Sequence, residues 1–204
     1  MKITLEENFR KNNAYFLADG HHRFGSTKRV ADSMKHCEEA QMILTMFMDE
    51  KEIGIDSFER WINISDMNFS MDQLYDRFEV NKKVGGFEIV EGDIEMFFQG
   101  KWFVLKSMQT INRDLPPEYL FSSILEPILG IKDAKKDTRI TYVHQKAIDQ
   151  SQEMLAKGLE VGFRLPAVSV ETLKKTALAG GTMPPKSTYI EPKLRSGMML
   201  HVFK

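Results

Sequence analysis

The apolar positions of the chain fall into short blocks separated by turn residues, a pattern that predicts strands alternating with short helices. The clearest block is IEMFFQGKWFVLK (94–106), in which two apolar runs are joined at Gln99-Gly100. A glycine at that point can take the positive φ that a tight hairpin turn requires. Apolar runs of strand length predict further strands over 15–18, 41–49, 53–64, 140–144, 160–166 and 198–203.

Helices are predicted where apolar residues recur every three or four positions beside a capping signal. Pro116 opens one that continues to Ile128, because proline fits the first turn of a helix and Gly130 follows as a stop. Ser169 is the predicted N-cap of another helix, since its hydroxyl can accept a hydrogen bond from a free N–H group. The same reasoning predicts helices over 25–40, 71–79 and 147–157.

Together these elements predict a fold of the α+β class: a single mixed domain with a largely antiparallel sheet and four to five helices. A length of 204 residues allows one large domain or two small ones. The sequence has no internal repeat, no low-complexity tract and no linker rich in proline or serine. We therefore predict one domain over residues 1–204.

Composition narrows the class of protein. The chain is 42% hydrophobic and 28% charged, as ordinary globular proteins are, and its formal net charge is −1. The absence of a basic excess argues against nucleic acid or an anionic membrane as a partner. The single cysteine, Cys37, forms no disulfide within the chain, and no apolar run approaches the length that spans a bilayer. We predict a cytoplasmic protein.

An Asp-Gly-His-His-Arg motif begins at Asp19, between an apolar run and a predicted helix. This placement brings the free N–H groups of a helix start next to Gly20, where the missing Cβ lets a ligand approach the backbone. Arg23 can hold two phosphate oxygens, and His21 and His22 can donate to phosphate or move a proton. The motif therefore predicts a phosphate site. The alternative is an ordinary Asp-Gly turn with solvated side chains.

A second polar stretch is GGTMPPKSTYIEPKLRSG (180–197), which combines prolines and glycines with cations and hydroxyls. Long rigid loops of this kind often carry function, although an ordered connection with solvated lysines fits the pattern as well. Zinc is not expected, because adjacent histidines point in different directions and neither His36 nor Cys37 lies at a ligand spacing from them.

Two stretches, YFLADGHHRFGSTKRVAD and AGGTMPPKSTYIEPKLRSGMMLHVF, closely resemble the bacterial domain-of-unknown-function 1015 family, in its C-terminal portion. The Asp-Gly-His-His-Arg element also resembles a signature shared by the partition protein ParB, the sulfiredoxins and the free-serine kinases. In those proteins the corresponding turn holds nucleotide phosphates. The resemblance implies a nucleotide- or phosphometabolite-binding domain whose phosphate site comprises Gly20, Arg23, Lys186, Ser187 and Thr188.

The same resemblance implies a kinase-like phosphotransferase if the chain is active, with a small hydroxyl such as free serine as acceptor. It implies that Asp19, His21 and His22 are the catalytic residues. The implied cofactors are ATP or ADP with Mg²⁺, and Asp19 holds the Mg²⁺. Zinc, flavin and haem are not expected. The alternative is a non-catalytic regulatory or assembly module that retains the fold. Family members carry a longer portion ahead of the motif, so we expect a homodimer or a partner that supplies it.

Overall fold

The computed structural model describes residues 9–11, 14–86, 89–108, 115–146, 148–193, 195 and 197–202. It is a mixed α+β structure with antiparallel strand pairing, which confirms the predicted class. The chain divides into two compact units, unit 1 (Met1–Ile53 with Pro192–Lys204) and unit 2 (Gly54–Glu191). The grouping of residues 1–204 into one domain stays a prediction.

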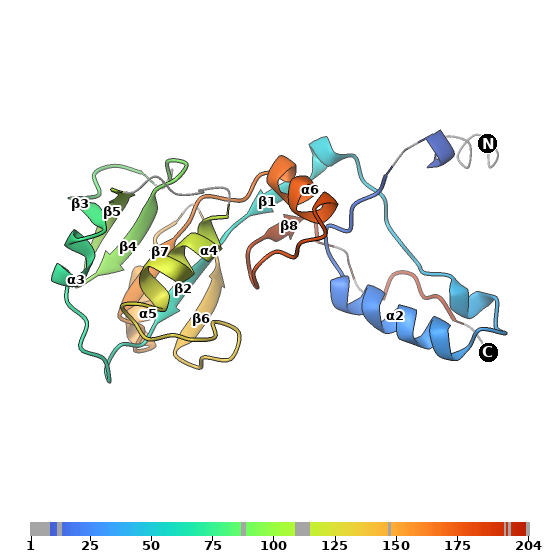
Figure 1. The fold of residues 1–204 in the computed structure, drawn as a ribbon, viewed down its shortest axis with the longest axis horizontal. Coiled ribbons are helices and arrows are strands. Elements are labelled where there is room, and N and C mark those ends of the chain that lie inside the picture. Colours follow the sequence, from blue (N-terminus) through green and yellow to red (C-terminus); the bar gives the residue numbers. More distant parts are fainter. Residues whose placement is uncertain are drawn as a thin grey trace. The chain divides into compact units, whose positions relative to one another are not determined.

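Unit 2 contains a six-stranded sheet in the order β3-β5-β4-β7-β2-β6 and a separate pair, β1-β8 (Figure 1). Its strands confirm the predictions at 94–106, 140–144 and 160–166, whereas the strand predicted over 53–64 divides into β1 and β2, which belong to different sheets. The strands are β1 Gly54–Asp56, β2 Phe58–Ile62, β3 Phe78–Lys82, β4 Ile94–Phe98, β5 Lys101–Ser107, β6 Ile140–His144, β7 Val161–Arg164 and β8 Tyr189–Glu191.

The hairpin between β4 and β5 forms as the sequence predicts. Its two turn residues both have positive φ, 47° at Gln99 and 77° at Gly100. Consecutive positive φ values give a two-residue turn whose twist matches that of the flanking strands, and glycine takes such values without steric cost. Phe98 and Lys101 accordingly pair across the turn.

Helical segments of unit 2 pack on both faces of the six-stranded sheet. Side chains of α4 and the following π-helical segment, such as Leu120 and Ile124, pack with Ile62 and Phe163 in the main core. Because side chains alternate along a strand, Trp61 points to the opposite face, where the α5 region packs. The helices are α3 Asp72–Tyr75, α4 Pro116–Leu120, the π-helical η3 Phe121–Leu125, α5 Ser151–Ala156 and α6 Val170–Leu178.

Two predicted helix starts are confirmed in unit 2. Pro116 stands in the first turn of α4, where its missing N–H has no cost. Ser169 is the N-cap of α6, and its Oγ accepts a hydrogen bond from the Thr172 N–H at 3.1 Å. Local capping chemistry therefore sets these boundaries.

Unit 1 contains the helix α2 (His21–Ser33) and the short 3-10 turns η1 (Glu39–Gln41) and η2 (Glu50–Glu52). The strands predicted over 15–18 and 41–49 are wrong: residues 14–18 and 42–49 lie outside helices and strands, with Leu44 54% and Phe47 51% exposed. Residues 198–202 of the predicted last strand are also irregular, and 203 lies outside the described residues. An apolar run becomes a strand only when a second strand supplies hydrogen bonds, and no described segment of unit 1 does so.

Candidate functional site

The helix α2 begins directly after a left-handed residue. Gly20, at the N-cap position, has φ 87° and ψ 21°, a conformation that favours glycine. The first intrahelical hydrogen bond runs from the Phe24 N–H to the Gly20 carbonyl at 2.9 Å. Among the described residues no acceptor bonds the N–H groups of His21, His22 and Arg23. These donors mark the positive end of the helix, so the helix starts at the motif and not at residue 25 as predicted.

The Arg23 guanidinium folds back over this helix start. A Cβ added at Gly20 would stand 3.1 Å from Nη2 of Arg23 and 3.3 Å from its Nε. Gly20 therefore serves twice, because it takes the positive φ and leaves the space that the guanidinium fills. A side chain at this position would have to take the positive φ and displace the guanidinium by a few tenths of an ångström.

Asp19 joins the helix start to a residue far along the chain, within unit 1. Its Oδ1 accepts a hydrogen bond from the Gly20 N–H at 2.6 Å, and its Oδ2 accepts one from Lys193 Nζ at 3.2 Å. Partial burial raises the pKa of Asp19, but these hydrogen bonds and the charges of Lys193 and Arg23 outweigh it and lower the pKa below 3.8. Asp19 is therefore an anion at neutral pH and holds Lys193 beside the helix start.

We call Asp19, His21, His22, Arg23 and Lys193 the helix-start cluster. Its fixed charges are two cations and one carboxylate, next to the positive end of a helix, and its side chains are exposed. Free N–H donors, a forked guanidinium and an ammonium group suit a phosphate or another oxyanion. Asp19, His21, His22 and Arg23 are residues of the predicted motif, and the fold adds Lys193 to them.

Lys193 is the member of the cluster that the sequence analysis did not select. It lies in the polar stretch 180–197, which was singled out, but its spacing gave no reason to prefer it over Lys186. Two features of the sequence point to Lys193: it lies in one of the two polar stretches that carry the family resemblance, and it directly follows Pro192. In the structure, Pro192 directly follows the last residue of β8.

The predicted second segment, Lys186–Thr188, belongs to unit 2. Lys186 has φ 55°, and its Nζ lies 5.1 Å from the centre of the Phe58 ring. Ser187 is 3% exposed, and its Oγ donates a hydrogen bond to the Pro184 carbonyl at 2.7 Å. Both residues thus have structural contacts within their own unit. The role of this segment in phosphate binding stays a prediction.

No group of three or more histidine, cysteine, aspartate or glutamate side chains in the described part of the chain could hold a metal ion. Asp19 alone offers carboxylate oxygens at the helix-start cluster. A single carboxylate is compatible with Mg²⁺ that takes its remaining ligands from phosphate and water. Along the described residues, no helix combines the length and the apolar composition needed to cross a bilayer.

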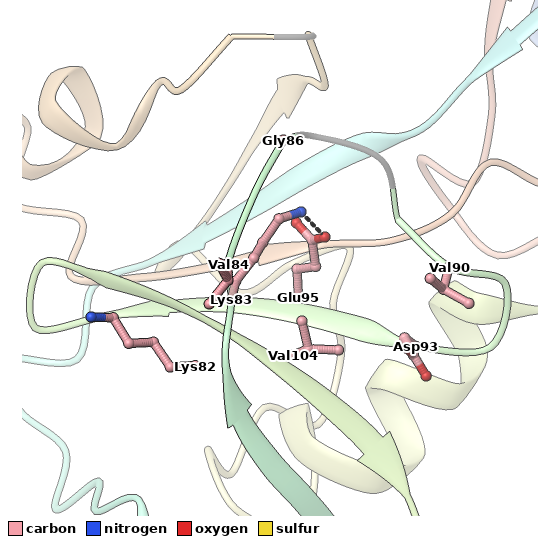
Figure 2. A pocket seen from close by; sticks show the side chains of 8 residues that line it. All are labelled: Lys82, Lys83, Val84, Gly86, Val90, Asp93, Glu95 and Val104. Carbon is pink, nitrogen blue, oxygen red and sulfur yellow. Dashed lines mark hydrogen bonds and ion pairs between the residues drawn. The ribbon is translucent and has the colours of Figure 1, made fainter.

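A cavity of about 510 Å³ in unit 2 contains the ion pair between Lys83 and Glu95 (Figure 2). Figure 2 shows the two side chains pointing toward one another, while the carboxylate of Asp93 points away. Glu95 is 2% exposed, and its Oε2 is buried without a hydrogen-bond partner among the described residues. The charge of Glu95 is already paired with that of Lys83, so this carboxylate calls for no ligand cation.

The fold and the helix-start cluster together define a class of protein: an α+β protein in which the start of a helix suits a phosphate group. The chain belongs to the family described as Protein of unknown function (DUF1015), whose model matches residues 2–128. No curated protein matches the chain.

Solved structures with some similarity are known. A mutant free serine kinase in complex with ADP is 16% identical, with a TM-score of 0.47 over 88% of this chain and 69% of that one. A free serine kinase in complex with AMP is 14% identical, with a TM-score of 0.46 over 88% and 68%. A conserved hypothetical protein from Pyrococcus furiosus is 16% identical, with a TM-score of 0.48 over 88% and 71%. These values assign no ligand or activity to this chain.

Proposed function

We propose that the chain binds the phosphate group of a nucleotide or of a phosphorylated small metabolite at the helix-start cluster. One observation carries the proposal: the free N–H groups at the start of α2 meet the Arg23 guanidinium, and Asp19 anchors Lys193 at the same place. Three kinds of donor then converge on one exposed point. The resemblance of the Asp-Gly-His-His-Arg element to phosphate-binding turns supports the same ligand.

The finer form of the proposal is a kinase-like phosphotransferase that uses ATP or ADP with Mg²⁺ and a small hydroxyl acceptor such as free serine. In that reaction Arg23 and the backbone N–H groups stabilise the charge of the phosphoryl group in transfer. His21 or His22 moves the proton of the hydroxyl, since both side chains are exposed at the helix start. Asp19 contributes one oxygen to Mg²⁺.

A second candidate is a non-catalytic assembly module, which the exposed apolar side chains of unit 1 favour. Phe9, Tyr15 and Phe47 form an aromatic cluster whose members are 39%, 49% and 51% exposed. Exposed apolar patches of this kind favour association. We therefore also propose a homodimer that covers this surface.

Calorimetric titration with ADP, ATP and inorganic phosphate, each with and without Mg²⁺, tests the binding proposal. Arg23→Ala should weaken phosphate binding at least about tenfold, because a hydrogen bond to a charged group contributes about 1.5–3 kcal/mol. Arg29→Ala is the matched control, since it removes the same charge from the same helix away from its start. Equal affinities in the two variants would refute the proposal.

Turnover of ATP to ADP in the presence and absence of free serine tests the finer proposal. Serine-dependent ADP formation that Arg23→Ala abolishes and Arg29→Ala retains would establish a phosphotransferase. Tight nucleotide binding with no turnover in the presence of serine or another small hydroxyl compound would favour the non-catalytic module.

A further inference from the structure

Arg60 is a buried cation in the middle of the sheet of unit 2. It stands in β2 between Tyr142 of β6 and Phe163 of β7, which are its partners in the strand register. Only 2% of its surface is exposed. Arg60 and Ile62 lie two residues apart in the strand, so both side chains are on the face that α4 and η3 cover.

The hydrogen-bond partners of the Arg60 guanidinium are carbonyl groups, and its Cζ lies 5.8 Å from the centre of the Tyr142 ring. Its Nη1 donates to the Phe58 carbonyl, and its Nη2 donates to the Lys186 carbonyl at 2.9 Å. A guanidinium carries five N–H donors, and these bonds use two of them. No carboxylate among the described residues forms an ion pair with it.

Burial changes the pKa of Arg60. Loss of hydration lowers the pKa of Arg60 to about 10, against a smaller raising effect of Tyr142. Arg60 still carries its charge at neutral pH. A buried charge that lacks an opposite charge is costly, and proteins normally pair such a group or use it to bind a ligand.

A second buried arginine in the same sheet shows the usual arrangement. Arg164 of β7 is 1% exposed, and its Nη2 and Nε lie 2.7 Å from Oε1 of Glu59. The sheet therefore provides a buried carboxylate for one arginine and none for the other. This difference needs an explanation that is specific to the surroundings of Arg60.

Those surroundings are a cavity of about 510 Å³ that Arg60 lines. The cavity lies among α4, the 132–135 segment and the 182–185 segment, all within unit 2. The lining also contains the cations of Lys132 and Lys135 and the hydroxyl group of Thr182. Pro117 and Phe121 supply an apolar wall.

The carboxylates that line this cavity do not neutralise the buried charge. Asp133 and Glu118 are exposed, and Asp133 is engaged by its own loop, with Oδ1 accepting from the Lys135 N–H at 2.9 Å and Oδ2 lying 3.7 Å from Lys136 Nζ. Three cations face two carboxylates in the lining. The buried part of the cavity is therefore positive, and its exposed edge carries charges of both signs.

We propose that this cavity is a second binding site, which takes a small molecule through an oxyanion, either a carboxylate or a phosphate group. The oxyanion pairs with the buried guanidinium of Arg60, Lys132 and Lys135 attract it at the entrance, and the apolar part of the molecule packs on Pro117 and Phe121. This site is independent of the helix-start cluster, since all of its residues belong to unit 2.

The test is a titration of the full chain with inorganic phosphate, acetate and benzoate at constant ionic strength, with chloride as the balancing ion. The nitrogen-bound Hε of Arg60 is followed by NMR, and its signal is assigned by its loss in Arg60→Lys. We expect a saturable shift of this signal with at least one oxyanion, together with a rise in Tm. Saturation with phosphate alone identifies a phosphate ligand, and saturation with the carboxylates alone identifies a carboxylate ligand.

Variants separate this site from the helix-start cluster. Arg60→Met should abolish the rise in Tm, whereas Arg23→Ala should retain it. Lys135→Met should weaken the apparent affinity by at most about fivefold, as expected of an exposed charge. Lys101→Met is the control, because Lys101 is an exposed lysine of β5 that lies outside the cavity lining; it should change nothing.

The NMR titration of the wild-type chain tests the proposal even if Arg60→Met does not fold. An Arg60 Hε signal that stays unchanged with phosphate, acetate and benzoate, up to concentrations of tens of millimolar, would overturn the proposal. A rise in Tm that persists in Arg60→Lys and Arg60→Met alike would overturn it as well, because the anion would then bind elsewhere.

Discussion

Two ion pairs, one from each unit, have opposite surroundings. In unit 2, Glu59 and Arg164 are joined at 2.7 Å with side chains that are 0% and 2% exposed. In unit 1, Asp19 and Lys193 are joined at 3.2 Å with side chains that are 53% and 44% exposed. Loss of one partner in a buried pair leaves an uncompensated charge, whereas an exposed pair contributes little to stability. The Glu59–Arg164 pair therefore serves the fold of unit 2, whereas the charges of the Asp19–Lys193 pair in unit 1 remain accessible to a ligand.

The remaining contacts of the buried pair support this interpretation. Oε2 of Glu59 accepts a hydrogen bond from Trp61 Nε1 at 2.6 Å, and Nη2 of Arg164 donates to the Ile148 carbonyl at 2.8 Å. The guanidinium also lies 4.5 Å from the centre of the Trp102 ring. No buried side-chain nitrogen or oxygen atom of the pair lacks a hydrogen-bond partner, so nothing in it calls for a ligand.

Arg164→Met should have the largest effect on stability. It leaves Glu59 buried without its cation, which should lower the free energy of unfolding by about 3–5 kcal/mol. Urea denaturation followed by tryptophan fluorescence measures the change. Arg139→Met is the control, because Arg139 pairs with Asp137 at the surface and its loss should change the free energy by at most about 1 kcal/mol.

A double variant tests the cause. Adding Glu59→Gln to Arg164→Met removes the unpaired charge and should restore part of the lost stability, since the two changes are coupled. Similar destabilisation by Arg164→Met and Arg139→Met, or no recovery in the double variant, would contradict the contrast between the two kinds of pair.

Local turn and cap chemistry was predictable from the sequence, because it depends on a few neighbouring residues. The Gln99-Gly100 turn and the Ser169 cap are both present as predicted. The apolar runs at 15–18 and 41–49 have the pattern of strands but do not form them, since a strand also depends on a distant partner that the pattern does not reveal. The motif residues of the candidate site could be selected by chemistry, but Lys193 could not, because only the folded chain brings it to Asp19.

The stability of unit 2 should depend on pH through its buried Glu95. Burial raises its pKa above 4.5, although the hydrogen bond and charge of Lys83 and the charge of Arg164 lower it. The folded state then binds more protons than the unfolded state between pH 4.5 and the raised pKa. The stability that Glu95 contributes is therefore complete below pH 4.5 and is lost as the pH rises through the folded pKa.

Denaturation of the wild type and Glu95→Gln across this pH range measures the effect. The difference in unfolding free energy, wild type minus variant, should increase as the pH falls. Glu153→Gln gives a control of opposite sign, because the hydrogen bond from Lys157 on the exposed α5 surface lowers the pKa of Glu153. A difference for Glu95→Gln that is constant with pH would show that burial does not shift this group.

The smallest effect on stability is expected from the exposed apolar residues of unit 1. Leu44→Ser combined with Phe47→Ser should lower the free energy of unfolding by about 1 kcal/mol per site, because both side chains are about half exposed and Phe47 also contacts the rings of Phe9 and Tyr15. If this surface covers a second copy of the chain, the double variant should nevertheless shift the concentration dependence of light scattering toward the monomer. Leu178→Ser, at a 74% exposed leucine of α6 in unit 2, should leave the scattering unchanged. Equal scattering in all three proteins would mean that the apolar surface of unit 1 has no role in association, and would leave ligand binding as the remaining use of its exposed residues.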